Sequence, residues 1–150
     1  MARAIELAVE NAESGRGGPF GAVIVRKGEI IAEGVNSVTR ENDPTAHAEV
    51  SAIREACAKL HTFELKDCEI YTSCEPCPMC LGAIYWARLR RVYYGGTAAD
   101  AAAAGFDDQF IYDEISREPA GRKLSMEEMM RMEALAAFRA WRESSDKAPY

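Results

Sequence analysis

Residues 71–88 read Tyr-Thr-Ser-Cys-Glu-Pro-Cys-Pro-Met-Cys-Leu-Gly-Ala-Ile-Tyr-Trp-Ala-Arg. The stretch opens within a short strand, which we expect over residues 68–73, and continues as a helix over about 77–88. A further apolar run, residues 91–94, follows and stops at two glycines. A strand, a helix and another strand in close succession favour a sheet that is covered by helices.

The sequence before this stretch supplies the remaining elements of such a domain. Apolar Ile5, Ala8, Val9 and Ala12 recur at helical spacing, so residues 1–14 are expected to form an amphipathic helix. Residues 20–26 and 29–34 are rich in β-branched and apolar side chains around Lys27-Gly28, the pattern of an antiparallel hairpin. Asp43-Pro44 is typical of a helix start, and that helix is expected to run to about Leu60. Together these elements predict a three-layer α/β/α domain with a central mixed β-sheet.

Length and charge limit the classes of protein to consider. The 150 residues suit one domain, and no repeat or linker divides them. The net charge of −6 is unlike that of a protein that grips a phosphate backbone, so we expect no nucleic-acid partner. No signal peptide and no apolar run of membrane-spanning length is visible, which predicts no membrane association and a cytoplasmic location. A last helix is expected over residues 126–142.

The cysteines indicate metal chemistry. There are five, and three of them fall between residues 74 and 80, a spacing unlike a disulfide framework. Cys77 and Cys80 are three residues apart at a helix start, so both sulfurs leave one face of the helix, where thiolates are stabilised. His47 lies on the buried face of the preceding helix. One imidazole and two thiolates on facing helices favour Zn²⁺, one ion per site.

The number of ligands separates two kinds of zinc site. Three protein ligands leave room for water and indicate catalysis, whereas a fourth would make the site structural. Cys74 could be that fourth ligand, and the protein would then be a non-enzymatic zinc module. Cys74 stands at the end of a strand, before the chain turns into the helix, so we favour His47, Cys77 and Cys80 alone.

Glu49 supports the catalytic interpretation. A carboxylate two residues from a ligand histidine, at an apolar helix start, is costly to bury without a partner. Beside a metal-activated water it could accept the water's proton and pass protons to a substrate.

These residues resemble a known family. His47-Ala48-Glu49 followed by Pro76-Cys77-Pro78-Met79-Cys80 matches the signature of zinc-dependent nucleobase deaminases. Further segments, 17–22, 42–49, 71–88, 104–108 and 140–142 with Tyr150, resemble the guanine deaminases of the cytidine/deoxycytidylate deaminase-like zinc-dependent superfamily. The resemblance implies a cytidine-deaminase-like fold and hydrolysis of guanine to xanthine and ammonia, with a zinc-activated hydroxide attacking C2 and Glu49 as the proton shuttle.

The resemblance also implies how the base is bound. Asp108 would orient or protonate the departing amine, and Asn36 would donate to O6 or N7 of guanine. The remaining residues of the implied substrate site are Phe20, His47, Ala48, Trp86 and Tyr150. Asp108 could instead cap the segment after Phe106, and Asn36 could belong to a turn.

The carboxyl-terminal segment, residues 126–150, is expected to form a helix and a tail that covers an active site. The resemblance implies a homodimer in which this segment is exchanged between subunits. Two other substrates stay open: adenosine in tRNA, and another aminated heterocycle such as cytosine or an aminotriazine.

Overall fold

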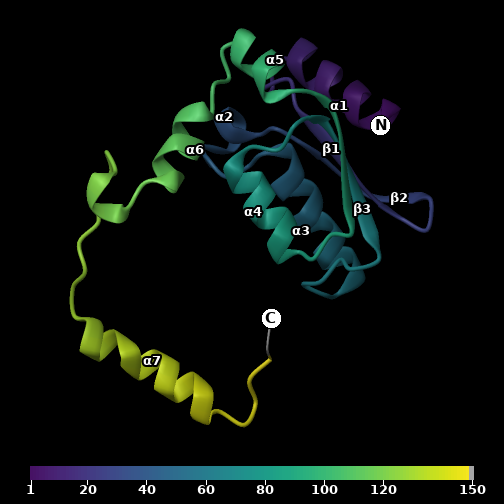
Figure 1. Ribbon diagram of the computed structural model, residues 1–150. Coiled ribbons are helices and arrows are strands. Elements are labelled where there is room, and N and C mark those ends of the chain that lie inside the picture. Colours follow the sequence, from purple (N-terminus) through teal and green to yellow (C-terminus); the bar gives the residue numbers. More distant parts are fainter. Residues whose placement is uncertain (149–150) are drawn as a thin grey trace. The chain divides into compact units, whose positions relative to one another are not determined.

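The computed structural model describes residues 1–148 and forms two units, residues 1–112 and residues 113–150. The first unit is a three-layer α/β/α domain, and its sheet has the order β2-β1-β3-β4 (Figure 1). Within residues 1–148, no helix combines the length and apolar character needed to cross a bilayer. The elements are, in order, α1 (Ala2–Glu13), β1 (Gly21–Arg26), β2 (Glu29–Val35), α2 (Val38–Glu41), α3 (Ala48–Leu60), β3 (Cys68–Cys74), α4 (Pro78–Trp86), β4 (Arg91–Gly96), α5 (Ala98–Ala103), α6 (Gln109–Ser116), η1 (Pro119–Gly121) and α7 (Arg131–Glu143).

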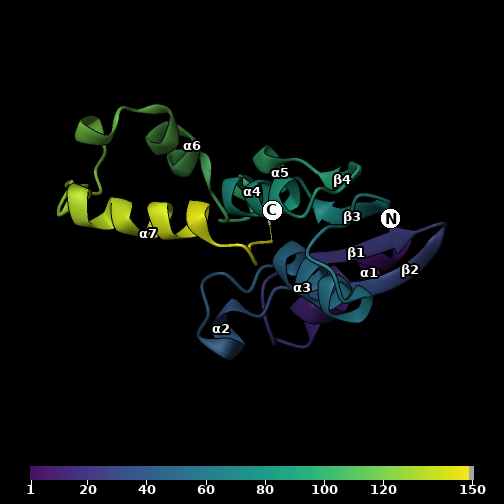
Figure 2. The ribbon, with the colours of Figure 1, turned by 90° about the horizontal axis from the view of Figure 1, so that it is seen from below.

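The predicted hairpin and mixed sheet are confirmed. Strand β1 is antiparallel to both β2 and β3, and β3 is parallel to β4. Figure 2 shows β1 and β2 running side by side. Lys27 and Gly28 both have positive φ, as the two central residues of a tight hairpin turn require.

Helices cover both faces of this sheet because successive side chains of β1 point to opposite sides. Ala22 and Ile24 belong to the core beneath α3 and α4, which lie side by side (Figure 1). Val23 packs instead with Ala4 and Leu7 of α1 on the other face. The three layers therefore follow from the alternation within one strand.

The first helix is confirmed, but its buried face differs from the predicted one. Ile5 and Val9 are exposed, and the buried residues of α1 are Ala4, Leu7, Ala8 and Asn11. The reason is close packing, since a Cβ atom on Gly21 would lie 2.4 Å from the Ala4 carbonyl oxygen. The face with Ala4, Leu7 and Ala8, rather than the one with Ile5 and Val9, therefore lies against the sheet.

The helix predicted from Asp43 begins later, at Ala48. The Asp43 carboxylate accepts hydrogen bonds from the backbone N–H and hydroxyl of Thr45, which makes a local turn in place of a helix cap. The short helix α2 lies between β2 and this turn. His47, with extended backbone, is the residue that precedes the first turn of α3.

The second unit is described by itself. Arg122 holds its first part together by donating to the backbone carbonyls of Glu114 and Arg117, and the helix α7 follows. That helix starts at Arg131, five residues after the predicted position, and residues 125–130 before it are not helical.

Strand β2 and helix α3 approach each other so closely that their contact depends on a missing side chain. A Cβ atom on Gly34 would lie 2.1 Å from the Ala48 carbonyl oxygen and 2.6 Å from the Ala52 nitrogen. Both alanines are buried. This contact fixes the first turn of α3, which carries Glu49, against the edge of the sheet.

We predict that Gly34→Ala destabilises the protein by about 2–3 kcal/mol, because α3 must move away from the sheet to admit the methyl group. Denaturant unfolding measures the loss. Gly82→Ala is the matched control: Gly82 lies within α4 with no atom near its missing Cβ, so the same change should be neutral or stabilise by up to about 1 kcal/mol. Equal effects at the two positions would contradict this account of the contact.

Candidate metal centre and active site

The candidate site lies where three strands end at the same edge of the sheet. Because β1 is antiparallel to both β2 and β3, the carboxyl ends of β2 and β3 share one edge, and β4 joins them as the parallel neighbour of β3. The segments that leave this edge lead into α3, α4 and α5. In α/β sheets, ligands bind characteristically at the carboxyl ends of strands.

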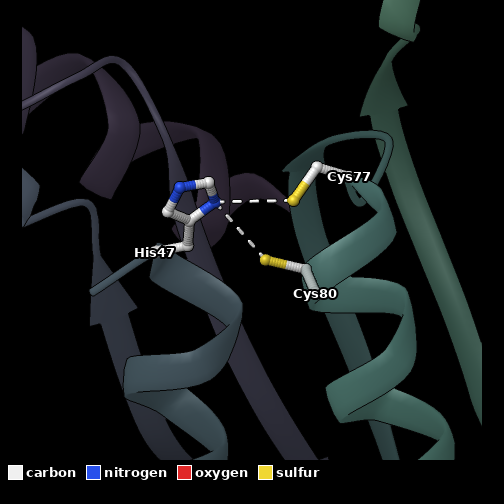
Figure 3. Close-up of side chains that lie close together, drawn as sticks. All are labelled: His47, Cys77 and Cys80. Atoms are coloured by element: carbon white, nitrogen blue, oxygen red, sulfur yellow. Dashed lines mark hydrogen bonds between the residues drawn. The ribbon is translucent and has the colours of Figure 1, made fainter. Parts of the chain in front are cut away.

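Two helix starts bring three metal-binding side chains together. His47 precedes α3, Cys77 precedes α4, and Cys80 lies in the first turn of α4 (Figure 3). The His47 Nδ1 atom lies 3.6 Å from the Cys77 sulfur and 3.5 Å from the Cys80 sulfur. The ligand atoms of the three residues all lie within 4.8 Å of one another.

These separations fit zinc. Tetrahedral Zn²⁺ with its usual bond lengths to imidazole nitrogen and thiolate sulfur separates those two atoms by about 3.6 Å. Both nitrogen-to-sulfur distances match that value. One borderline nitrogen and two sulfurs are also the donor set that zinc prefers over magnesium or calcium.

The pKa values of the two metal-binding thiols are shifted in opposite directions. A hydrogen bond from Cys80, helped by the neighbouring His47, lowers the pKa of the Cys77 thiol to about 4. The pKa of the Cys80 thiol is raised, first because that thiol donates to Cys77 and then because it is buried beside Glu49. The shifts have opposite directions, so Cys77 is the thiol of the pair that more readily gives up its proton.

Glu49 is buried in the first turn of α3, beside the metal-binding residues. Its exposed fraction is 8%, and its Oε2 atom accepts a hydrogen bond from the Cys80 sulfur at 3.4 Å. Burial raises the pKa of this carboxyl. A carboxyl whose pKa is raised can both accept and return a proton.

Cys74 does not join the group of three. Its sulfur donates to the Thr97 carbonyl oxygen at 3.5 Å, and it is absent from the cluster of metal-binding atoms found among residues 1–148. Burial raises the pKa of the Cys74 thiol. The arrangement favours three protein ligands.

A pocket of about 270 Å³ opens beside His47 and Glu49. This volume is near the lower end of the range for small-molecule sites, about 300–1,000 Å³. It belongs entirely to the first unit. Its lining residues are Phe20, Asn36, His47, Glu49, Cys74, Glu75, Cys77, Ala98, Ala101, Gly105, Phe106, Asp107 and Asp108.

Polar and aromatic groups face each other in this pocket. Loss of solvent raises the pKa of Asp108, and the negative charge of Cys77 raises it further, so Asp108 is close enough to sense the metal-binding thiols. Phe20 meets Phe106 edge to face, with ring centroids 5.0 Å apart. The pocket therefore combines apolar ring surface with hydrogen-bonding groups.

Three residues of the predicted site lie elsewhere or are not described. Trp86 is 63% exposed on α4, with Arg88 over its ring, and is not among the lining residues of the pocket. Ala48 is buried against Gly34 and does not line the pocket either. Tyr150 lies outside the described residues.

Sequence reasoning missed some of the lining residues. Glu75 and Phe106 were quoted only as parts of longer motifs, although each is close to a predicted site residue. Glu75 accepts a hydrogen bond from the Ala98 nitrogen and so ties the end of β3 to the start of α5. Proximity to the cysteine motif and to Asp108 was the available signal for both.

Comparison with known proteins agrees with this site. Residues 1–96 match the family model of the cytidine and deoxycytidylate deaminase zinc-binding region. A guanine deaminase of Bacillus subtilis (strain 168) is 56% identical over 150 residues, covering 100% of this chain and 96% of that protein. A tRNA-specific adenosine deaminase of Aquifex aeolicus is 46% identical over 97 residues, which make up 64% of this chain and 63% of that protein.

Solved structures give the same grouping. The crystal structure of guanine deaminase from Bacillus subtilis matches with a TM-score of 0.97 at 56% identity, over 99% of this chain and 95% of that one. A guanine deaminase structure from Nitrosomonas europaea matches with a TM-score of 0.68 at 37% identity, over 71% and 62% of the two chains. The fold, the cluster of His47, Cys77 and Cys80, and these similarities lead to one conclusion: the chain belongs to the cytidine and deoxycytidylate deaminase family of zinc-binding proteins.

Proposed function

We propose that this protein hydrolyses guanine to xanthine and ammonia. The observation that carries the proposal is the buried carboxyl of Glu49 beside the three metal-binding residues, at a pocket whose other walls hold Asn36 and Asp108. The Bacillus subtilis relative, a guanine deaminase, spans the whole of this chain.

His47, Cys77 and Cys80 are the residues that would hold the zinc. The bound metal supplies a Lewis acid that brings the pKa of a coordinated water toward neutrality. His47 and Cys77 also line the pocket, so a zinc ion held by the three residues would border the space for the substrate.

Glu49 moves the protons of the reaction. Its carboxylate takes a proton from the attacking water and gives it to N3 of the purine. It then transfers the second proton to the amine on C2, which leaves as ammonia. Burial of Glu49 supports this role because a raised pKa lets one carboxyl both accept and release a proton.

Asn36 and Asp108 recognise the two edges of the base. The Asn36 Oδ1 atom already accepts hydrogen bonds from the backbone N–H groups of Gly18 and Val38. Its Nδ2 group is thus the part available to donate to O6 or N7. Asp108, an acceptor when ionised, suits N1–H and the amine. Phe20 supplies apolar surface for the ring.

Adenosine in tRNA fits this chain less well. An anticodon loop carries many phosphates, whereas the chain has a net charge of −6 and places Asp107 and Asp108 in the lining of the pocket. The tRNA deaminase relative from Aquifex aeolicus also covers less of the chain than the guanine deaminase does. A free base is the substrate that these features favour.

We further propose that the enzyme is a cytoplasmic homodimer of purine catabolism in which the segment 126–150 is exchanged and Tyr150 covers a site. Apolar residues of the second unit support an intersubunit role. Met132 and Phe138 of α7 are 66% and 65% exposed, and Trp141 is 45% exposed. A partner subunit would bury such side chains.

Glu49→Gln should lower the rate of guanine turnover by about 10²- to 10⁴-fold, while the fold and the zinc content stay as in the wild type. The amide keeps the shape of the carboxyl but cannot shuttle protons. Ammonia release with guanine, adenine, cytosine and tRNA as parallel substrates measures the effect. Glu55→Gln, an exposed change on the same helix, is the control. Xanthine formation at the normal rate by Glu49→Gln would disprove the shuttle.

Cys80→Ser should lose zinc and activity, whereas Cys74→Ser should keep one zinc per chain and most of the activity. The reason is that only Cys80 of this pair lies within reach of His47. Metal analysis of the purified variants decides the matter. Loss of zinc from Cys74→Ser would instead indicate a closed structural site with four ligands.

Mixed dimers test the exchanged segment. Glu49→Gln and Tyr150→Ala chains are each expected to be impaired, but one site of a mixed dimer would combine an intact Glu49 with the partner's intact tail. Random mixing should then restore about a quarter of wild-type activity. Activity no higher than the average of the two parents would show that the tail acts on its own chain or not at all.

A further inference from the structure

Asn11 is a buried amide on a helix face that otherwise carries small and apolar residues. It is 3% exposed and lies on the same face of α1 as Leu7 and Ala8. An amide in such a position is costly unless its hydrogen-bonding groups find partners. Its partners therefore show what the position requires.

The Asn11 side chain joins two segments that line the pocket. Its Nδ2 group donates to the Gly18 carbonyl oxygen at 2.8 Å and to the Asn36 carbonyl oxygen at 2.9 Å. The first carbonyl belongs to the glycine-rich segment before Phe20, and the second follows strand β2. One amide group thus holds both segments at a fixed separation.

The backbone of Gly17 packs closely against this amide and against Asn36. A Cβ atom on Gly17 would lie 2.0 Å from the Asn36 carbonyl oxygen and 2.8 Å from the Asn11 Nδ2 atom. The glycine-rich segment therefore rests directly on the backbone of Asn36. Without the Asn11 side chain, the Asn36 carbonyl would lose the donor that the structure gives it from α1.

The position of the Asn36 side chain depends on the same segments. Its Oδ1 atom accepts a long hydrogen bond, 3.4 Å, from the Gly18 nitrogen. The Asn36 nitrogen in turn donates to the Phe20 carbonyl oxygen at 3.1 Å, and the Phe20 nitrogen donates to the Gly18 carbonyl oxygen. Asn11 therefore holds the backbone of both Gly18 and Asn36, the two residues whose hydrogen bond orients the Asn36 side-chain amide.

We infer that Asn11 is a positioning residue for substrate specificity: it holds Asn36 so that its amide donates to the O6 and N7 edge of the purine. Asn11 does not line the pocket, so it would act through Asn36 and not on the base. This inference rests on the proposed function, because it assigns to Asn36 the recognition of one edge of guanine. It extends the substrate site to a residue of α1.

Asn11→Leu is the informative variant, because leucine has a similar size but no N–H group. Three substrates separate the acceptor atoms: guanine, 6-thioguanine, which keeps N1–H but has a weakly accepting sulfur in place of O6, and 7-deazaguanine, which lacks N7. The Asn36→Ala variant is measured first. The analogue whose kcat/KM this variant leaves unchanged is the one that lacks the atom to which the Asn36 amide donates. Asn11→Leu should then lower kcat/KM for guanine about three- to tenfold, mostly through KM, and change that analogue less than twofold.

A double variant tests whether Asn11 acts through Asn36. Asn11→Leu in an Asn36→Ala background should cause no further loss of preference for guanine over the analogue. Leu7→Ala, which opens a cavity on the same helix but keeps the hydrogen bonds from Asn11, is the control. It should lower the unfolding temperature and leave the preference unchanged.

A measurement on the ligand-free protein separates this inference from the proposed activity. The side-chain amide signals of Asn36 in a ¹⁵N NMR spectrum should be single and sharp in the wild type and in Leu7→Ala, but broadened or doubled in Asn11→Leu. Unchanged signals, or an equal loss with every substrate, would overturn the positioning role. Absence of guanine turnover in the wild type would disprove the proposed function, while the NMR comparison would still decide whether Asn11 orders Asn36.

Discussion

The candidate site depends on the close contact between β2 and α3 at Gly34. Because Gly34 has no side chain, the backbone of α3 rests on the strand, and Ala48 and Ala52 are buried there. This contact leaves little freedom for the start of α3, so His47 and Glu49 cannot shift along the sheet edge. The second helix start, with Cys77 and Cys80, follows the end of β3, where the Glu75 nitrogen donates to the Gly96 carbonyl oxygen. The packing at Gly34 and this hydrogen bond lie in different segments, and a change in either would change the distances from His47 to the two sulfurs.

Sequence reasoning succeeded where local spacing decides the outcome. The hairpin around Lys27-Gly28 and the pair Cys77 and Cys80 are properties of a few adjacent residues, and the structure contains both. The start of α3 was wrong because Asp43 can either cap a helix or close a turn with Thr45, and the two uses have the same local sequence. The buried face of α1 was wrong because it is chosen by contact with Gly21, which is distant in the sequence. Asn11 was missed for the same reason, since its partner Asn36 lies 25 residues away.

Only some of the residues predicted to contact the substrate line the pocket. Phe20, Asn36 and Asp108 all line the pocket, since they leave the sheet edge or follow α5 nearby. Trp86 is near Cys80 in the sequence but lies at the far end of α4, where a helix of nine residues has carried it away from the metal-binding residues. Sequence distance along a helix is not distance from a site at its start. A role for Trp86 in covering a base would need a contribution from another segment or subunit.

The electrostatics of the site indicate why a metal belongs there. A negative Cys77 thiolate, a buried Glu49 and the nearby Asp108 concentrate acidic groups in a pocket partly removed from water. Burial raises the pKa values of Glu49 and Asp108, the hydrogen bond to Cys77 raises that of Cys80, and the nearby negative charges add to each shift. A divalent cation between His47 and the sulfurs would reverse this balance: it would favour deprotonation of both thiols and help Glu49 to ionise. The same carboxyl that is costly in the metal-free chain would then be a base in contact with activated water, so binding of zinc and readiness for proton transfer are linked through one group.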